Sequence, residues 1–459
     1  MNSRLTATLL PALLLAGCAV GPDYAPPDPG ALPGALPGGD GGGEVRAVFG
    51  PEGTGTAEAQ AITALWEIAA TNNLDILQAV KRIEASRAAL AGSRAEYWPS
   101  VGFSAGTSKA KNFNPSSSSE RSTLGFDASW ELDLFGKVRR SVEAAGAELE
   151  ASEYSLADAL ASLRAEIAGE CVNLALQRRL LEITGKNLDL QRDFEKIARE
   201  KFEAGLAPEL DWLSAQSQLF ATEASLPSLA ASATGCVRRI ELLCGLTPGT
   251  LDNEPELLSF PPLPEWGGFG VPATVPSELL RRRPDVRRAE RAYAAALARV
   301  GVSQASYYPS LTIGAGFSLA SDSFARWGDA VRSISFGPSV SWSILSFGRT
   351  KARVAQARAA AEEAAIAYRA AALNAFHEVE DAAVSLAGYE ARLPALTAAR
   401  DAQRRADDLA LKMYREDLGE YRDVLTAHQS LLSHERTLDE VRANAILSQI
   451  TLAKALAVQ

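Results

Sequence analysis

The sequence has few residues of the kinds that carry chemistry. It contains three histidines and four cysteines in 459 residues, and none of them has the spacing of a zinc site or of a His-Glu-x-x-His motif. The phosphate-binding loop, the dinucleotide fingerprint and the Gly-x-Ser-x-Gly nucleophile elbow are also absent. His377, His428 and His434 do not share one helix face, which favours structural or solvated roles. These absences argue against an enzyme, a metal site and a bound cofactor.

Two further absences concern partners and membrane helices. The net charge of −10 leaves no basic excess that would attract nucleic acid. No run of about eighteen apolar residues occurs after the first residues, so a transmembrane helix is not expected. The apolar content of 47% and the charged content of 22% are nevertheless those of a folded protein.

Proline is missing from one long stretch, Gly136 to Ala204, which covers 69 residues. Apolar residues recur there mostly at steps of three and four, as on one face of an amphipathic helix. At about 1.5 Å per residue, a helix of this length would reach roughly 100 Å. The pattern breaks at residues 205–208 and returns from about Pro208 to Leu243. We therefore expect a hairpin of two very long helices, as in a strut or in the wall of a tube.

The first residues resemble the signal of a bacterial lipoprotein. An apolar run, Leu5–Leu15, is followed by Ala-Gly and then Cys18. In this interpretation residues 1–17 are a signal peptide and Cys18 carries the lipid, whose acyl chains anchor the protein. Ala19 stands where an aspartate would change sorting, and its presence favours the outer membrane. The alternative is an ordinary signal peptide with a cysteine by chance. Residues 18–56, rich in glycine and proline, are predicted to form the lipid anchor and an extended tether.

The body of the chain contains an internal duplication. Three pairs of segments match at an offset of 210 or 212 residues: 97–100 with 307–310, 130–137 with 342–349, and 211–216 with 423–428. One duplication explains all three matches. It divides the chain into a first repeat at 57–246, a linker rich in proline and glycine at 247–275, and a second repeat at 276–459.

Each repeat also contains two segments in which apolar and polar residues alternate. The strands are expected at about 99–109 and 122–134 in the first repeat and at about 309–320 and 332–345 in the second, with loops at 110–121 and 320–331. Their length suits a tilted membrane-spanning strand. Aromatic residues at the strand ends suit a membrane interface. The polar face consists of Gly, Ser and Thr, as in a wet lumen; a soluble sandwich is the alternative.

The number of strands bears on the oligomeric state. Four strands cannot close a membrane barrel, which needs at least about eight. Open sheet edges are not tolerated in lipid, because their backbone groups would lack hydrogen-bond partners. If these strands span a bilayer, several chains must therefore share one barrel, and three chains would supply about twelve strands.

These features together resemble the outer-membrane efflux proteins, in particular the OprM/NodT-like lipoprotein branch of the TolC superfamily. The resemblance rests on the lipobox with Cys18–Tyr24, on the Tyr-Trp-Pro-Ser and Tyr-Tyr-Pro-Ser turns, and on the two Phe-Gly strand-to-helix turns. It implies an α+β membrane protein built from a duplication. A homotrimer would share one β-barrel in the outer membrane and one long-helix α-barrel in the periplasm.

The resemblance also implies a function. Relatives are passive exit ducts of tripartite pumps, with a periplasmic adaptor protein and an inner-membrane transporter of the RND class as partners. A duct for ABC-driven type I protein secretion is the alternative, but the lipid anchor and the Gly-Pro-Asp-Tyr start favour efflux of drugs or other small molecules. A non-conducting strut is disfavoured by the Gly, Ser and Thr face of the strands.

A gate is implied at the periplasmic helix turns, chiefly the second. Relatives place an acidic residue shortly after a tyrosine-containing turn, and the matching position here is Thr426, which departs from that pattern. Asp423 lies three residues earlier on the same helix face. We therefore expect the acidic ring at Asp423, with Arg422 as an ion-pair partner. A solvated helix start explains Asp423 as well, and it explains Asp211, the equivalent residue in the first turn, equally well.

Two cysteines are candidates for a disulfide. In an antiparallel hairpin that turns near residue 206, Cys171 lies level with roughly residue 241. Cys244 is then less than one turn away, and Cys236 is slightly farther. The periplasm permits disulfides. The alternative is that all three are small, buried apolar residues.

Overall fold

The structure is a computed structural model that describes residues 19–25, 57–113, 116–259, 282–322, 327, 330–416 and 418–456. The predicted signal peptide, Cys18 and most of the tether lie outside the described residues. The helices and strands are α2 (Ala57–Asn72), α3 (Leu74–Ala95), β1 (Ser100–Phe113), β2 (Ser116–Leu132), α4 (Lys137–Glu203), α5 (Glu209–Leu243), η2 (Leu251–Asn253), η3 (Pro255–Leu258), α7 (Pro284–Ala305), β3 (Ser310–Ser321), β4 (Val331–Ser341), α8 (Arg349–Arg415) and α9 (Tyr421–Ala455).

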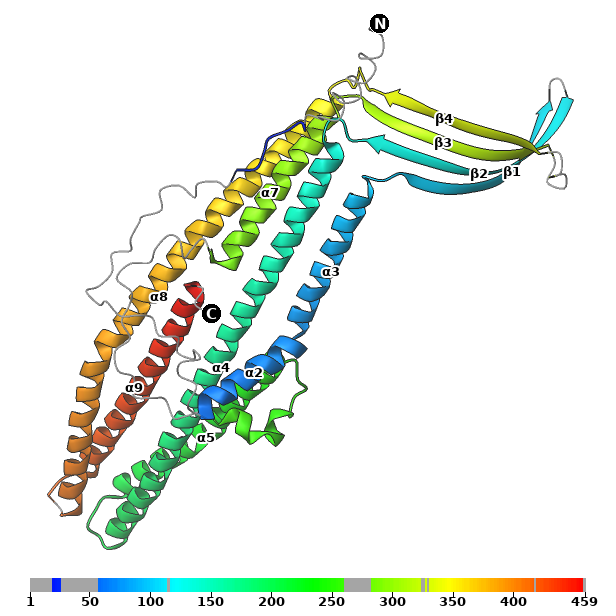
Figure 1. Cartoon of the computed structure of the whole chain (residues 1–459). Coiled ribbons are helices and arrows are strands. Elements are labelled where there is room, and N and C mark those ends of the chain that lie inside the picture. Colours follow the sequence, from blue (N-terminus) through cyan, green and yellow to red (C-terminus); the bar gives the residue numbers. More distant parts are fainter. Residues whose placement is uncertain are drawn as a thin grey trace. The chain divides into compact units, whose positions relative to one another are not determined.

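The chain forms two compact units. The strand unit contains residues 80–155 and 285–371 together with the N-terminal segment 19–25. The helical unit contains residues 57–79, 156–284 and 372–456, within the described part of the chain. Figure 1 labels the elements of both.

The lengths of the helices support the duplication. Helices α4 and α8 both have 67 residues, α5 and α9 both have 35, and α3 and α7 both have 22. Individual contacts recur as well. The indole Nε1 of Trp130 donates to the carbonyl of Tyr97 (2.9 Å), and Trp342 donates to Tyr307 in the same way (3.1 Å). The two halves therefore repeat both their helix lengths and the hydrogen bond that joins helix end to strand.

A second recurring contact lies in the helical unit. The amide of Asn73 donates to the carbonyl of Leu243 (2.8 Å), and the guanidinium of Arg283 donates to the carbonyl of Ala455 (3.0 Å). Both donors are buried. The carbonyls belong to the last turns of α5 and α9, which have no partner within their own helix. Each repeat thus ties its beginning to its end.

The four strands form one antiparallel sheet in the order β1-β2-β3-β4 (Figure 1). Strands β1 and β2 are longer than predicted: Lys109 pairs with Glu120, and Phe113 pairs with Ser116. The prediction of a loop at 110–121 was therefore wrong. The loop was predicted from a polar run of serines, but a strand that faces water on one side tolerates such residues as well.

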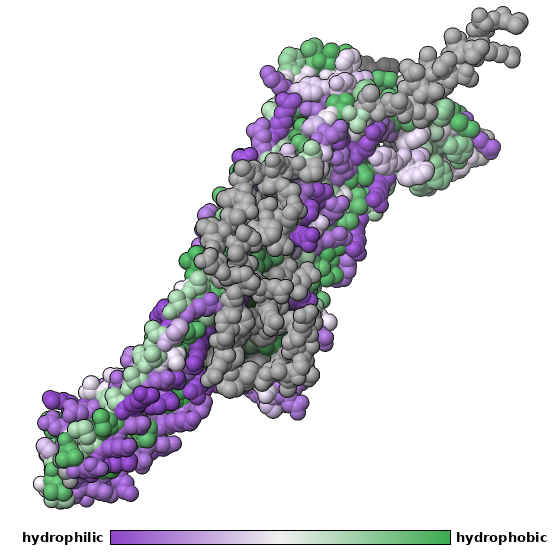
Figure 2. Space-filling model, turned by 60° about the vertical axis from the view of Figure 1, so that its left-hand side comes forward, coloured by the Kyte–Doolittle hydropathy of each residue, from purple (hydrophilic) through white to green (hydrophobic). Residues whose placement is uncertain are grey.

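One face of the sheet is apolar and the other is polar. The register aligns Phe103, Phe126, Phe317 and Ile334 in one row across all four strands. These four side chains are 40–82% exposed in the single chain, and Figure 2 shows green hydrophobic surface over the strands. The neighbouring row on the opposite face contains Gly102, Asp127, Gly316 and Ser335.

Local chemistry sets the ends of α4. The carboxylate of Asp133 accepts hydrogen bonds from the backbone N–H groups of Val138 (3.0 Å) and Arg139 (2.8 Å), in the first turn of the helix. At the other end, Gly205 has a φ of 72°, and the N–H of Leu206 donates to the carbonyl of Lys201 (2.8 Å). This is a Schellman ending.

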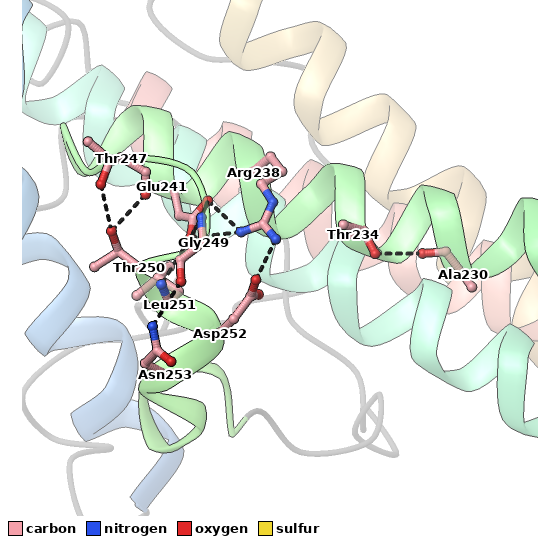
Figure 3. A network of polar contacts seen from close by, with 10 residues as sticks. All are labelled: Ala230, Thr234, Arg238, Glu241, Thr247, Gly249, Thr250, Leu251, Asp252 and Asn253. Carbon is pink, nitrogen blue, oxygen red and sulfur yellow. Dashed lines mark hydrogen bonds and ion pairs between the residues drawn. The ribbon is translucent and has the colours of Figure 1, made fainter.

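The largest cluster of buried residues joins α2, α4 and α5 in the helical unit. Its members include Leu65, Ile167, Leu174 and Ile240, each at most 1% exposed. Beside it lies a polar clamp that fastens the segment after α5 (Figure 3). The carboxylate of Glu241, 1% exposed, accepts from the N–H groups of Gly249 and Leu251 (both 2.9 Å) and from Arg238.

None of the helices within the described ranges contains a segment that is both long and apolar enough to cross a membrane.

Candidate functional site

The predicted gate residues lie at the ends of the two helical hairpins, both in the helical unit. Helix α5 follows Pro208, whose backbone is extended (φ −66°, ψ 149°). Helix α9 follows Glu420, which is extended in the same way (φ −89°, ψ 150°). Before α9 the N–H of Leu418 donates to the carbonyl of Met413 (2.8 Å), as Leu206 does to Lys201 before α5.

A buried cluster holds the two hairpin ends together. It contains Phe194 and Ala198 of α4, Ala215 of α5, Tyr414 of α8, and Tyr421 and Val424 of α9. Lys201 of α4 adds a polar contact to this cluster. Its ammonium lies 4.1 Å from the centre of the Tyr414 ring and donates to the Tyr414 carbonyl (2.9 Å). The cation–π contact and the apolar packing make the two hairpin ends one packed region.

The first two turns of α9 place Asp423 and Thr426 on the exposed side of the helix. Tyr421 and Val424 lie on the opposite, buried side. Arg422 forms an ion pair with Glu420 (3.4 Å), and both side chains are at least 75% exposed. Within the single chain Arg422 therefore pairs with Glu420, and its expected pairing with Asp423 stays a prediction. The hydroxyl of Thr426 donates to the carbonyl of Arg422 (2.8 Å), so it is used within the helix.

Asp211 lies in the first turn of α5, and its charge affects the pKa of Tyr421. Burial of the Tyr421 phenol, with smaller contributions from the neighbouring Tyr414 and from the charge of Asp211, raises its pKa to about 12. The phenol is therefore neutral at any physiological pH. Asp211 thus faces the packed region between the hairpins, whereas Asp423 faces outward.

The three described cysteines, Cys171, Cys236 and Cys244, have free thiols and are buried. All three belong to the large cluster that joins α2, α4 and α5. Burial raises the pKa of the Cys171 thiol, and it raises that of Cys244 to about 11. Because the thiolate is the form that reacts, these thiols are poor partners for exchange. The pairing of Cys171 with Cys244 stays a prediction.

The strand unit contains a docking site for the N-terminal segment. The guanidinium of Arg140, 4% exposed, donates to the carboxylate of Asp23 (2.5 Å) and to the carbonyl of Gly21 (3.3 Å). The hydroxyl of Tyr24 donates to Glu290 (2.6 Å), and Arg291 lies 4.9 Å from the centre of its ring. Burial and the Glu290 carboxylate raise the pKa of Tyr24. Figure 1 shows this segment as the dark blue coil, without regular secondary structure, beside α7 and α8.

This docking fixes the position of Ala19, the residue that follows Cys18 in the sequence. A Cβ on Gly136 would lie 2.8 Å from Cα of Ala19, so the two backbones touch. The N–H of Val20 donates to the carbonyl of Phe135 (3.1 Å). The sequence predicted an extended tether but not that its first residues are held at the strand-to-helix turn.

A buried polar seam between α4 and α9 was also missed. Three hydrogen bonds between side chains cross it: Arg179 to Asp439 (3.1 Å), Arg436 to Thr184 (2.9 Å), and His428 to Asn187 (2.6 Å). Thr184, Asn187 and Gln191 are each at most 4% exposed. Their spacing of three and four on α4 is visible in the sequence, but apolar residues at the same spacing are what a helix interface usually shows.

Comparison with known proteins gives consistent matches along the chain. The family model described as outer membrane efflux protein matches residues 65–246 and 275–458. "Nodulation protein T" of Rhizobium leguminosarum bv. trifolii is 29% identical over 455 residues, which cover 97% of this chain and 94% of that protein. "Solvent efflux pump outer membrane protein SrpC" of Pseudomonas putida is 28% identical over 97% of this chain and 96% of its own length.

A solved structure agrees with the sequence matches. The outer-membrane channel OprN has a TM-score of 0.84 and 30% sequence identity to this chain, over 96% of this chain and 99% of its own. The agreement includes the long helices and the four-stranded sheet, which together make the fold α+β.

Proposed function

The chain belongs to the outer membrane efflux protein family, and on that premise we propose that it is the outer-membrane exit duct of a tripartite efflux pump of the RND type. Members of this family form channels in the outer membrane and are not enzymes. In the proposal, drugs or other small molecules pass through the duct without an energy source of its own. An adaptor protein in the periplasm and an inner-membrane transporter deliver them.

The observation that carries the proposal is the two-faced sheet. Its apolar row, with Phe126 and Ile334 at 53% and 82% exposure, is not covered by any of the described residues. An exposed apolar face of this kind is stable against lipid, and a face of Gly, Ser and Asp is stable against a wet lumen. Among the described residues, strands β1 and β4 each have one edge without a partner strand. Three copies joined edge to edge would remove these edges, and we propose a homotrimer on that ground.

The lipid anchor is part of the proposal. Cys18 would carry the acyl chains, and the docked residues Ala19–Tyr24 would hold it beside Phe135. Phe135 stacks on Tyr308 with the ring centres 4.7 Å apart, and aromatic rings of this kind favour the membrane interface. Radioactive palmitate should label the parent protein and not Cys18→Ala. Equal labelling of both would exclude the anchor.

The gate is proposed at the second hairpin end. In a trimer the exposed Asp423 side chains of three chains would face one axis, where like charges repel each other unless a cation or Arg422 lies near. Thr426 would lie in the same lining one turn away, and Asp211 would support the packed region behind it. We further propose that Cys171 and Cys244 form a disulfide, which would lie outside this lining; mass spectrometry of unreduced peptides would detect it.

Planar-bilayer recording tests both the duct and its gate. Purified parent protein should conduct, and Asp423→Ala should open more often or to a higher conductance. Arg422→Ala should do so too, and both should admit more vancomycin to cells. Glu416→Ala, an exposed acidic residue near the end of α8, is the matched control and should behave as the parent. If the parent never conducts, the duct is wrong. If it conducts and both variants match it, only the gate is wrong.

A further inference from the structure

We propose that His428 is a proton-operated positioning residue that sets how firmly the gate-bearing helix α9 is held against α4 and α8. This inference deepens the proposed function and rests on it. His428 lies five residues after Asp423, about 7 Å farther along α9. It faces the buried side of the helix and is 5% exposed, so it does not line a lumen.

Both ring nitrogens of His428 have an oxygen within hydrogen-bond distance. Nδ1 lies 3.3 Å from each carboxylate oxygen of Asp407 on α8. Nε2 lies 2.6 Å from the amide oxygen of Asn187 on α4. The ring of Phe194, also on α4, meets the imidazole edge-on with centres 5.6 Å apart. One side chain of α9 thus contacts both of the long helices.

The partners fix what each protonation state can do. A carboxylate only accepts, so Nδ1 carries a proton in either state. In the neutral ring Nε2 then accepts and needs the amide N–H of Asn187. In the imidazolium ring Nε2 donates and needs the amide oxygen of Asn187. A half-turn of the Asn187 amide therefore satisfies both states, and neither state is excluded by the seam.

The two states differ in how strongly they hold α9. Protonation turns the contact with Asp407 into a buried ion pair, and it makes the hydrogen bond to Asn187 charge-assisted in addition to the one to the Asp407 carboxylate. The nearby charged pair, Arg404 of α8 with Glu435 of α9 (2.5 Å), lies farther along the same helices and is already satisfied. Proton uptake at His428 should therefore fasten α9 to both neighbours, and proton loss should loosen it.

The seam around His428 is not fully bonded, which allows it to rearrange. Gln191, one turn along α4 from Asn187, is 1% exposed, and its amide oxygen has no partner among the described residues. A partly satisfied buried network is weaker than a complete one. Nearer the hairpin ends the packing is apolar instead, around Tyr414, Tyr421 and Val424. The polar seam is thus the part of the interface whose strength a proton can change.

Single-channel recording at pH 5 to 8, where imidazoles titrate, tests the proposal. Transitions between open and closed levels of the parent should become roughly three- to tenfold rarer as pH falls through this range, because charge-assisted bonds must break. His428→Gln keeps donor and acceptor atoms but does not titrate, so its gating should be flat with pH. His434→Gln, on the same helix, is the control and should keep the parent profile.

Two further variants separate a proton switch from a structural role. Asn187→Asp places the imidazole between two carboxylates and should raise the midpoint of the profile by about one pH unit or more. Asp407→Asn should lower it. A merely structural residue would change stability without moving a midpoint, and these variants also serve if His428→Gln yields no folded channel.

The outcomes distinguish this inference from the function on which it rests. A conducting parent whose gating does not vary with pH overturns the role of His428 alone. So does a His428→Gln variant that keeps the parent profile, or an Asn187→Asp variant whose midpoint does not move. A parent that never conducts overturns the duct, and the positioning role fails with it.

Discussion

The two strand-to-helix turns share a Phe-Gly pattern but differ in what surrounds them. In the first, Gly136 (φ 77°) touches Ala19 of the docked N-terminal segment. In the second, a Cβ on Gly348 (φ 87°) would meet no atom of a described residue within 4 Å, and Phe347 is 97% exposed. The backbone of the turn was duplicated, whereas the N-terminal segment exists once and occupies one copy.

The same asymmetry holds for the polar contacts of the two repeats. Asp133 caps α4, and its counterpart in the second repeat is Leu345, whose side chain cannot accept a hydrogen bond. Glu241 clamps the segment after α5, and its counterpart is Ala453. Apolar periodicity and helix length are thus the same in both repeats. The polar contacts differ, because each repeat binds different neighbouring segments of the chain. The first repeat holds the linker, and it holds the N-terminal segment at Gly136 and Arg140 while Glu290 and Arg291 of the second repeat bind Tyr24.

The largest effect is expected where the first repeat has a buried charge and the second has none. Glu241→Ala leaves the N–H groups of Gly249 and Leu251 without their acceptor and should reduce the free energy of unfolding by about 3 kcal/mol. Ala453 needs no such group, so Ala453→Ser should change it by less than about 1 kcal/mol. Thermal unfolding in detergent measures both.

A pH series makes the same test sharper. Burial alone would raise the pKa of Glu241, but Arg238 and the N–H groups of Leu251 and Gly249 outweigh it and hold the pKa below 4.5. The carboxylate therefore stabilises the fold above pH 4.5, and this stabilisation is lost as pH falls through the lower, folded-state pKa. Glu241→Gln should remove that acid-dependent part. If the stability of Glu241→Gln falls at acid pH as much as that of the parent, Glu241 is not the source of this pH dependence.

The next effect separates the two Phe-Gly turns directly. Gly136→Ala introduces a Cβ 2.8 Å from Cα of Ala19 at a positive φ, and should cost about 3 kcal/mol and release the N-terminal segment. Gly348→Ala has the positive φ but would place its Cβ within 4 Å of none of the residues that the structure describes, and should cost about 1 kcal/mol. Thermal unfolding gives the difference, and protease cleavage within residues 19–25 reports the release. Equal losses in both variants would mean that docking adds nothing.

The sequence predicted the elements that depend on periodic patterns. The proline-free stretch became α4, the break at Gly205 became its Schellman ending, and the alternating segments became four strands. It did not predict the extent of β1 and β2, because a run of serines is compatible with both a loop and a strand whose one face meets water.

The sequence was least informative where function depends on contacts between distant segments. Nothing local marks Arg140 as the partner of Asp23, or His428 as the partner of Asn187 and Asp407, since these residues are 117, 241 and 21 positions apart. The neighbours of Arg422 in sequence offer two carboxylates, and within the single chain Arg422 pairs with Glu420. Its pairing with Asp423, expected in a ring formed by several chains, stays a prediction.

The smallest expected effect concerns Phe135 and Phe347, for which substitution by asparagine should change the free energy of unfolding in opposite directions. Phe347 has a φ of 44°, a conformation that costs a bulky residue about 1 kcal/mol and that asparagine tolerates. Because the ring is 97% exposed, Phe347→Asn loses no contact within the chain and should stabilise it by up to about 1 kcal/mol. Phe135→Asn removes the stack on Tyr308 and should destabilise by about 1 kcal/mol. Thermal unfolding in detergent measures both signs. A loss in both variants would show that the Phe347 ring is held by lipid or by a second chain, and the second turn would then be occupied in the assembly as the first is in the single chain.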